Sequence, residues 1–138
     1  MKKIFYMKGY YSSIEKDTLE NDCYRKVVYT GHYLQIVLMS LNVGEEIGSE
    51  THAANDQFFR FESGHGKSMI DSNEYVVKSG DAVLAPAGAK HNVINTSQTE
   101  KLTFYTIYAP PNHEQHTIRQ RKSDAEKNPE EFDGLTSE

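Results

Sequence analysis

The chain has 138 residues, 37% of them apolar and 25% charged, which is the balance of a single globular domain with one core. Its 15 Lys and Arg against 20 Asp and Glu give a net charge of -5, the wrong sign for a nucleic-acid partner. No window approaches the roughly 18 apolar residues of a membrane helix, and the first eight residues hold too short an apolar stretch for a signal peptide. We therefore expect a cytoplasmic protein with no membrane partner.

The predicted elements are short strands that follow an N-terminal arm of residues 1–23. Apolar runs rich in β-branched and aromatic residues alternate with clusters of Gly, Asn, Asp and Ser, and no long helical period interrupts them. The predicted strands are 25–30, 34–41, 48–52, 57–63, 66–71, 73–78, 82–85, 91–95 and 101–108. This pattern predicts an all-β sandwich or barrel within residues 1–118.

Residues 119–138 form a charged tail with only Ala125, Phe132 and Leu135 as apolar residues. So few apolar side chains cannot form a core of their own, and we expect a frayed segment. One helical turn is predicted over residues 123–127, where Ser123 precedes Glu126 at the spacing of a capping box.

The single cysteine, Cys23, excludes an internal disulfide and a zinc site built on cysteine pairs. Any metal must therefore bind to His and oxygen ligands. Side chains alternate between the faces of a strand, so Glu50 and His52 share a face. A turn over residues 53–56 then allows Gln57 to return on a neighbouring strand and face the same interior.

A second polar segment follows the strand 82–85. Pro86 and Gly88 form a Pro-x-Gly turn, in which the glycine is free to adopt positive φ, and the next strand begins with His91. The turn therefore directs the histidine toward the barrel interior.

These two segments resemble the two sequence motifs of the cupin family. The second motif is complete in Gly80, Pro86, Gly88, His91 and Asn95. The first has the family's spacing from Gly44 to Gly64, but Glu50-x-His52 followed by Gln57 replaces the usual His-x-His followed by Glu. The 21 residues between Gly64 and Pro86 match the spacer of small single-domain cupins.

The resemblance implies a cupin jelly-roll barrel, or double-stranded β-helix, holding a divalent metal on Glu50, His52, Gln57 and His91. Two imidazoles and two oxygens favour Mn, Fe or Ni over Cu, with Zn also possible. In one alternative, Glu50 is an unligated general base whose pKa burial raises. In another, the barrel keeps polar side chains but has lost its metal.

Other residues are assigned from parity and context. Phe59 and Phe61 lie two and four residues after Gln57, so they share its face of the strand, and they are predicted to line the pocket with Tyr105. The last strand allows two registers, one with Tyr105 and Ile107 inward and one with Phe104, Thr106 and Tyr108 inward. His65 is expected in solvent, and His113 with His116 forms a weak candidate for a surface metal site.

The four predicted ligands indicate a small metal-dependent enzyme that acts on a small oxygen-rich molecule through isomerase-like or dioxygenase-type chemistry. Similar proteins are often labelled mannose-6-phosphate isomerase-like, but apart from Lys90 the sequence shows no cluster of Lys or Arg near the site that could hold a phosphate. The alternative is a non-catalytic module that binds or senses a small molecule. Nine tyrosines and six phenylalanines would suit an interface, and small cupins often dimerise, so we expect a homodimer.

Overall fold

The computed structural model describes residues 7–138, so part of the N-terminal arm and its apolar stretch lie outside the described residues. The helices are α1 (Ile14–Glu20) and α2 (Lys122–Lys127). The strands are β1 (Arg25–Thr30), β2 (Gln35–Leu41), β3 (Glu50–Thr51), β4 (Asp56–Ser63), β5 (His65–Ile70), β6 (Asn73–Lys78), β7 (Ala82–Ala85), β8 (Lys90–Asn95), β9 (Leu102–Ala109) and β10 (Ile118–Arg119).

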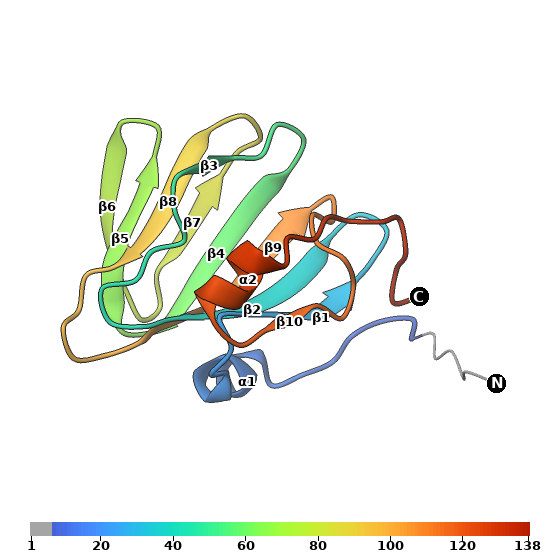
Figure 1. Ribbon diagram of the computed structural model, residues 1–138, viewed down its shortest axis with the longest axis horizontal. Coiled ribbons are helices and arrows are strands. Elements are labelled where there is room, and N and C mark those ends of the chain that lie inside the picture. The colour runs from blue at the N-terminus through green and yellow to red at the C-terminus, as the bar shows by residue number, and fades with distance from the viewer. Residues whose placement is uncertain (1–6) are drawn as a thin grey trace.

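The strands form two antiparallel sheets that enclose one core (Figure 1). The six-stranded sheet has the order β10-β1-β2-β9-β4-β7, and the four-stranded sheet has the order β3-β8-β5-β6. All nine predicted strands are present, and the all-β prediction is confirmed. Among residues 7–138, no helix has the length and apolar character that a membrane crossing requires.

Two elements were not predicted. Helix α1 has only seven residues, and Thr18, its buried residue, bonds its hydroxyl back to the Ile14 carbonyl at 2.7 Å. Acidic residues in its first turn, Glu15 and Asp17, were an available signal, since they favour a helix N-terminus. Strand β10 has two residues and exists through its pairing with β1, which no local pattern could indicate.

The core decides the register of the last strand. Phe104 in β9 lies directly opposite Phe61 in β4, and both side chains are buried with their ring centroids 5.4 Å apart. Phe104, Thr106 and Tyr108 therefore face inward, while Tyr105 and Ile107 face outward and are only partly buried. The assignment of Tyr105 to the pocket is wrong, because alternation along β9 is fixed by this aromatic pairing.

The tail is docked on the barrel rather than frayed (Figure 1). Helix α2 begins at Lys122, and the Arg121 backbone amide donates to the Asp124 carboxylate at 3.2 Å, in place of the expected pair at residues 123 and 126. Near the chain end, the Ser137 amide donates to the Thr30 carbonyl at 2.7 Å, and the Thr30 amide donates to the Ser137 hydroxyl at 2.9 Å. These polar contacts, together with Ala125, which packs against the core, hold this segment.

Candidate metal centre

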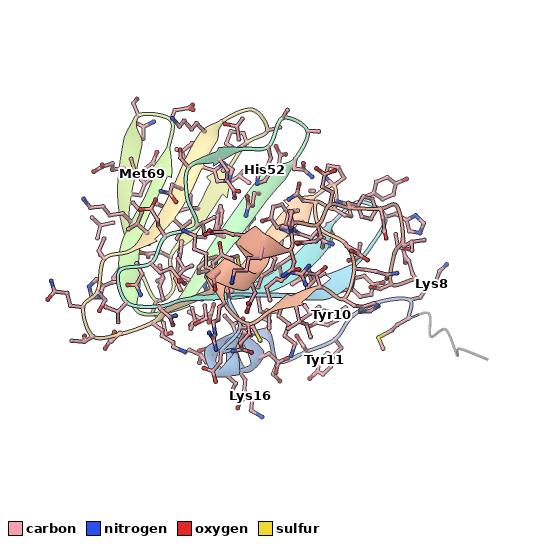
Figure 2. The ribbon with its side chains drawn as sticks, in the orientation of Figure 1. Lys8, Tyr10, Tyr11, Lys16, His52 and Met69 are labelled. Atoms are coloured by element: carbon pink, nitrogen blue, oxygen red, sulfur yellow. The ribbon has the colours of Figure 1, made fainter. Side chains whose placement is uncertain are left out.

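Backbone pairing brings the predicted ligands together from both sheets. Glu50 in β3 lies directly opposite His91 in β8, so their side chains share one face of the four-stranded sheet. His52, which is labelled in Figure 2, follows β3. Its carbonyl accepts the Gly88 amide at 2.9 Å. Gly88 has φ of +86°, as the Pro-x-Gly turn predicted. Gln57 approaches the same point from β4 in the six-stranded sheet.

Four potential ligand atoms converge inside the barrel. Glu50 Oε1 lies 3.3 Å from His52 Nε2 and 3.8 Å from His91 Nε2. Gln57 Oε1 lies 3.0 Å from His91 Nε2. Ligands about 2.1 Å from one ion are separated by roughly 3 to 4.2 Å, depending on whether they are adjacent or opposite. These three separations fit a single divalent ion.

The protons on His91 strengthen this interpretation. Its Nδ1 lies 3.2 Å from the Ala89 carbonyl, and its Nε2 lies 3.0 Å from the Gln57 Oε1 atom. Both oxygens can only accept, and a neutral imidazole has one proton to donate, so it can satisfy only one of them. With that proton on Nδ1, a cation bound by Nε2 and Gln57 Oε1 would satisfy both contacts.

His52 supplies a second unsatisfied acceptor position. Its Nε2 is buried and has no hydrogen-bond partner among the described residues, although the Glu50 carboxylate is close. A buried polar nitrogen without a partner costs about 1 to 3 kcal/mol. The donor set therefore fits a metal on a structural observation that is independent of the sequence motifs.

The orientation of Gln57 is fixed by a residue that the sequence analysis did not assign to the site. Gln57 is fully buried, and its Nε2 donates to the Thr106 hydroxyl at 3.0 Å. This bond aims the amide oxygen, which is the candidate metal-binding atom, toward His91. Outer partners of this kind set the orientation of metal ligands. Thr106 could have been chosen only if the register of the last strand had been known.

The electrostatics favour an ionised Glu50. Burial raises the pKa of Glu50, but the interaction with the adjacent His52 and the nearby His91 outweighs it, so the pKa lies below its usual value. The general-base alternative required a raised pKa, and the structure gives the opposite direction. A carboxylate with a lowered pKa is suited to metal ligation.

Aromatic side chains surround the four ligands. Phe59 is 1% exposed and meets the His91 ring nearly edge-on, with centroids 6.0 Å apart. Phe61 is also buried, but it stacks on Phe59 and so lies one layer further from the ligands. Tyr108 takes the place expected for Tyr105, with its ring edge-on to His52 at 5.6 Å.

The remaining histidines do not form a second metal site. His65 is exposed, as expected. His113 was expected on an unanchored surface segment with His116, but it is 6% exposed and bonds to Tyr108 and Glu130 instead. His116 is exposed, whereas His113 is buried, so the two do not share a surface. The tail that buries His113 is the reason for the difference.

Comparison with known proteins agrees with this architecture. Residues 37–108 match the model of the Cupin domain family. The chain is 42% identical over 124 residues to the uncharacterized protein YrkC of Bacillus subtilis (strain 168), covering 86% of this chain and 66% of YrkC. It is 39% identical over 107 residues to the uncharacterized protein L612 of Acanthamoeba polyphaga mimivirus, covering 75% and 67%.

The chain thus spans about two thirds of the length of these curated relatives. The crystal structure of BH2720 from Bacillus halodurans is similar with a TM-score of 0.85 and 38% sequence identity, covering 88% of this chain and 96% of that one. The family match covers more than half of the residues and contains both motifs. The chain belongs to the cupin family, and its barrel has the family's double-stranded β-helix fold.

Proposed function

We propose that this cupin is a small metal-dependent enzyme whose divalent ion binds to Glu50, His52, Gln57 and His91. The observation that carries the proposal is the convergence of four potential ligand atoms, in which Glu50 Oε1 lies close to both histidines and Gln57 Oε1 lies 3.0 Å from His91 Nε2. One carboxylate and three neutral ligands match one negative charge to a divalent cation. The mixed oxygen and imidazole set favours Mn, Fe, Ni or Zn.

The chemistry proposed for the site is isomerisation or dioxygenation of a small oxygen-rich molecule. A bound divalent ion would act as a Lewis acid on a carbonyl or diol of that molecule. Glu50 has the most exposed side chain of the four, at 34%, whereas His91 is 5% exposed. The substrate would therefore approach past Glu50, while Phe59 keeps water from the opposite side of the His91 ring.

A phosphorylated sugar does not fit this proposal. Lys90 is paired with Thr51 in the strand ladder, on the opposite face from Glu50 and His91. Arg25 lies beside the Glu130 carboxylate at 3.4 Å. The described residues near the ligands thus offer no unpaired cation for a phosphate, and the substrate class is an unphosphorylated hydroxy-carbonyl or diol.

Turnover tests the enzymatic proposal. Protein reloaded separately with Mn²⁺, Fe²⁺, Ni²⁺ and Zn²⁺ would be incubated with a panel of hydroxy-carbonyl and diol compounds, with and without oxygen. We expect product with the wild type and none with His91→Ala, whose circular dichroism spectrum should be unchanged. Stoichiometric binding of a panel compound without product would instead favour the non-catalytic binding module. Unchanged turnover in His91→Ala would contradict a role for the metal.

The proposed assembly is a homodimer formed through the outer face of the six-stranded sheet. Ile36, Ile107, Phe58 and Leu84 are consecutive cross-strand neighbours and form an apolar row on that face. Leu84 is 56% exposed, and the other three are partly buried. A flat apolar row can pair with its own copy across a two-fold axis. Light scattering should give twice the 15.7 kDa chain mass, and Leu84→Glu should shift it toward the monomer.

A further inference from the structure

A buried chain of hydrogen bonds runs from the metal centre to the C-terminal tail. The Tyr108 hydroxyl lies 3.2 Å from His113 Nε2, and His113 Nδ1 lies 2.9 Å from Glu130 Oε1. Tyr108 is 2% exposed, His113 is 6% exposed, and the Glu130 side chain is 4% exposed. Three polar groups, from the end of β9, the segment after it and the C-terminal tail, are thus held together inside the protein.

Tyr108 lies at the metal-centre end of this chain. It is the direct cross-strand neighbour of Gln57 on the inner face of the six-stranded sheet. Its ring also meets the His52 ring edge-on, at a centroid distance of 5.6 Å and an angle of 85°. The tyrosine therefore contacts one proposed ligand and neighbours another, without belonging to the ligand set.

The charges around Glu130 decide where the protons lie. Burial raises the pKa of Glu130, but His113, Arg25 and Arg119 outweigh it, so the carboxylate stays ionised and can only accept. Burial and Arg25 lower the pKa of His113, and they outweigh the neighbouring Glu130 carboxylate, which raises it. The His113 ring is therefore neutral. His113 therefore donates from Nδ1 to Glu130 and accepts at Nε2 from the Tyr108 hydroxyl.

A second buried amide holds His113 in place. Gln35 Oε1 accepts the His113 amide at 2.9 Å and the Asn112 amide at 3.1 Å. Gln35 Nε2 donates to the His113 carbonyl at 2.7 Å and to the Thr30 hydroxyl at 2.9 Å. All four hydrogen-bonding positions of this amide are used, so the histidine backbone is rigidly fixed.

We propose that the Tyr108 hydroxyl oxygen accepts a hydrogen bond from a hydroxyl group of the metal-bound substrate. His113 and Glu130 are positioning residues, which direct the proton of the Tyr108 hydroxyl away from the metal centre. The tail then completes the active site by supplying Glu130. The inference rests on the proposed metal function and narrows its substrate to molecules with a hydroxyl next to the metal-binding oxygen.

A matched pair of probes tests the acceptor role. Glycolate carries a hydroxyl beside its carboxylate, whereas methoxyacetate has the same carboxylate and an ether oxygen that cannot donate. Both would be titrated into Co²⁺-loaded protein while the visible absorption of the cobalt is recorded. We expect the wild type to bind glycolate more tightly. In Tyr108→Phe the glycolate Kd should rise about tenfold, equivalent to about 1.4 kcal/mol, with the methoxyacetate Kd unchanged.

Two further variants separate positioning from simple stability. In Glu130→Gln the fixed, charged acceptor is lost, because the amide can present either its oxygen or its NH2 group to His113 Nδ1, and the preference for glycolate should fall several-fold at unchanged Co²⁺ content. Tyr105→Phe, on the outward face of the same strand, is the matched control and should keep the wild-type preference. If Tyr108→Phe loses Co²⁺, the glycolate preference of Glu130→Gln decides the question.

The contradicting outcomes are distinct. Wild-type protein with one Co²⁺ and no preference for glycolate, or Tyr108→Phe and Glu130→Gln proteins that keep the full preference, would overturn the role of Tyr108 while leaving the metal site intact. Failure of the wild type to bind Co²⁺ would overturn the proposed function, and this inference with it.

Discussion

The two sheets contribute different kinds of side chain to the candidate metal centre. The four-stranded sheet and the turn after β3 supply Glu50, His52 and His91, which carry the charge and both imidazoles, and Glu50 is partly open to solvent. The six-stranded sheet supplies Gln57 and Tyr108, which are neutral and almost completely buried. One half of the site can exchange with solvent, whereas the other is fixed by hydrogen bonds.

This difference would allow the proposed ligand set, which departs from the usual cupin motif, to keep its geometry. A neutral amide binds a metal well only when its oxygen is aimed correctly, and Thr106 does this from the buried side. Compared with the usual cupin motif, the carboxylate is at position 50, on the more exposed side. It depends less on an orienting hydrogen bond there, because the neighbouring imidazoles already favour its ionised form. The following predictions test this division of roles, beginning with the largest effect.

Phe59 packs against His91 in the buried layer and should be the most costly side chain to truncate. Phe59→Ala is expected to lower the free energy of unfolding by about 3 to 5 kcal/mol, because it leaves a cavity beside the ligands. Val76→Ala is the control, since Val76 is 80% exposed and its truncation should cost less than about 0.5 kcal/mol. Urea unfolding curves measure both, and equal costs would contradict the described packing.

His91→Ala removes a candidate ligand that contacts side chains of both sheets, Glu50 in one and Gln57 in the other. Metal affinity should fall by more than about 100-fold, since loss of outer partners alone typically reduces affinity by about 10 to 100-fold. Competition with a chromophoric chelator measures the change. His65→Ala serves as the matched control, because His65 lies in the same sheet but is exposed. A similar loss in both variants would mean that His91 has no special role.

Thr106→Val tests the buried half without touching a ligand. The valine has nearly the same shape but cannot accept the Gln57 amide proton, so the amide loses its fixed orientation. We expect metal affinity to fall by about 10 to 100-fold while the protein remains folded. Thr51→Val, at an exposed position beside Glu50, should have little effect. Wild-type affinity in Thr106→Val would show that Gln57 orients without this bond.

The smallest effect is a pH dependence of stability from His113. Its pKa is lowered by burial, so the unfolded chain binds this proton more readily than the folded protein does. The free energy of unfolding should therefore decrease as the pH falls below about 6.5, until the folded pKa is reached. Glu130, with its lowered pKa, acts in the same direction below about pH 4.5.

The difference in stability between wild type and His113→Gln isolates the histidine contribution. Measured by urea unfolding of metal-free protein from pH 8 to pH 5, this difference should change with pH in favour of the variant as the pH falls. A difference that is independent of pH would contradict a buried, neutral His113.

Local patterns were sufficient to predict the strands and the four candidate ligands. Glu50, His52 and Gln57 lie within eight residues, and His91 follows a turn whose glycine needs positive φ, so short-range spacing contains the information. Alternation could not choose between Tyr105 and Tyr108, because aromatic and β-branched residues occupy both faces of β9. Only the pairing of Phe61 with Phe104 across the sheet fixes that register.

The docked tail was beyond the reach of sequence patterns for a different reason. Glu130 is a charged residue in a polar segment, which ordinarily indicates a solvated chain, yet its side chain is 4% exposed. Its partners Arg25 and His113 are 105 and 17 residues away in the sequence. Burial of a charge depends on such distant partners, and no composition rule identifies them.

Metal content is the measurement that tests the central claim most directly. Wild-type protein, purified untagged and without chelator, would be compared by plasma mass spectrometry with a Glu50→Ala, His52→Ala double variant. The account predicts close to one equivalent of Mn, Fe, Ni or Zn per chain in the wild type and almost none in the variant. A wild type that stays empty after reloading with each ion in turn would contradict it and leave a metal-free binding barrel.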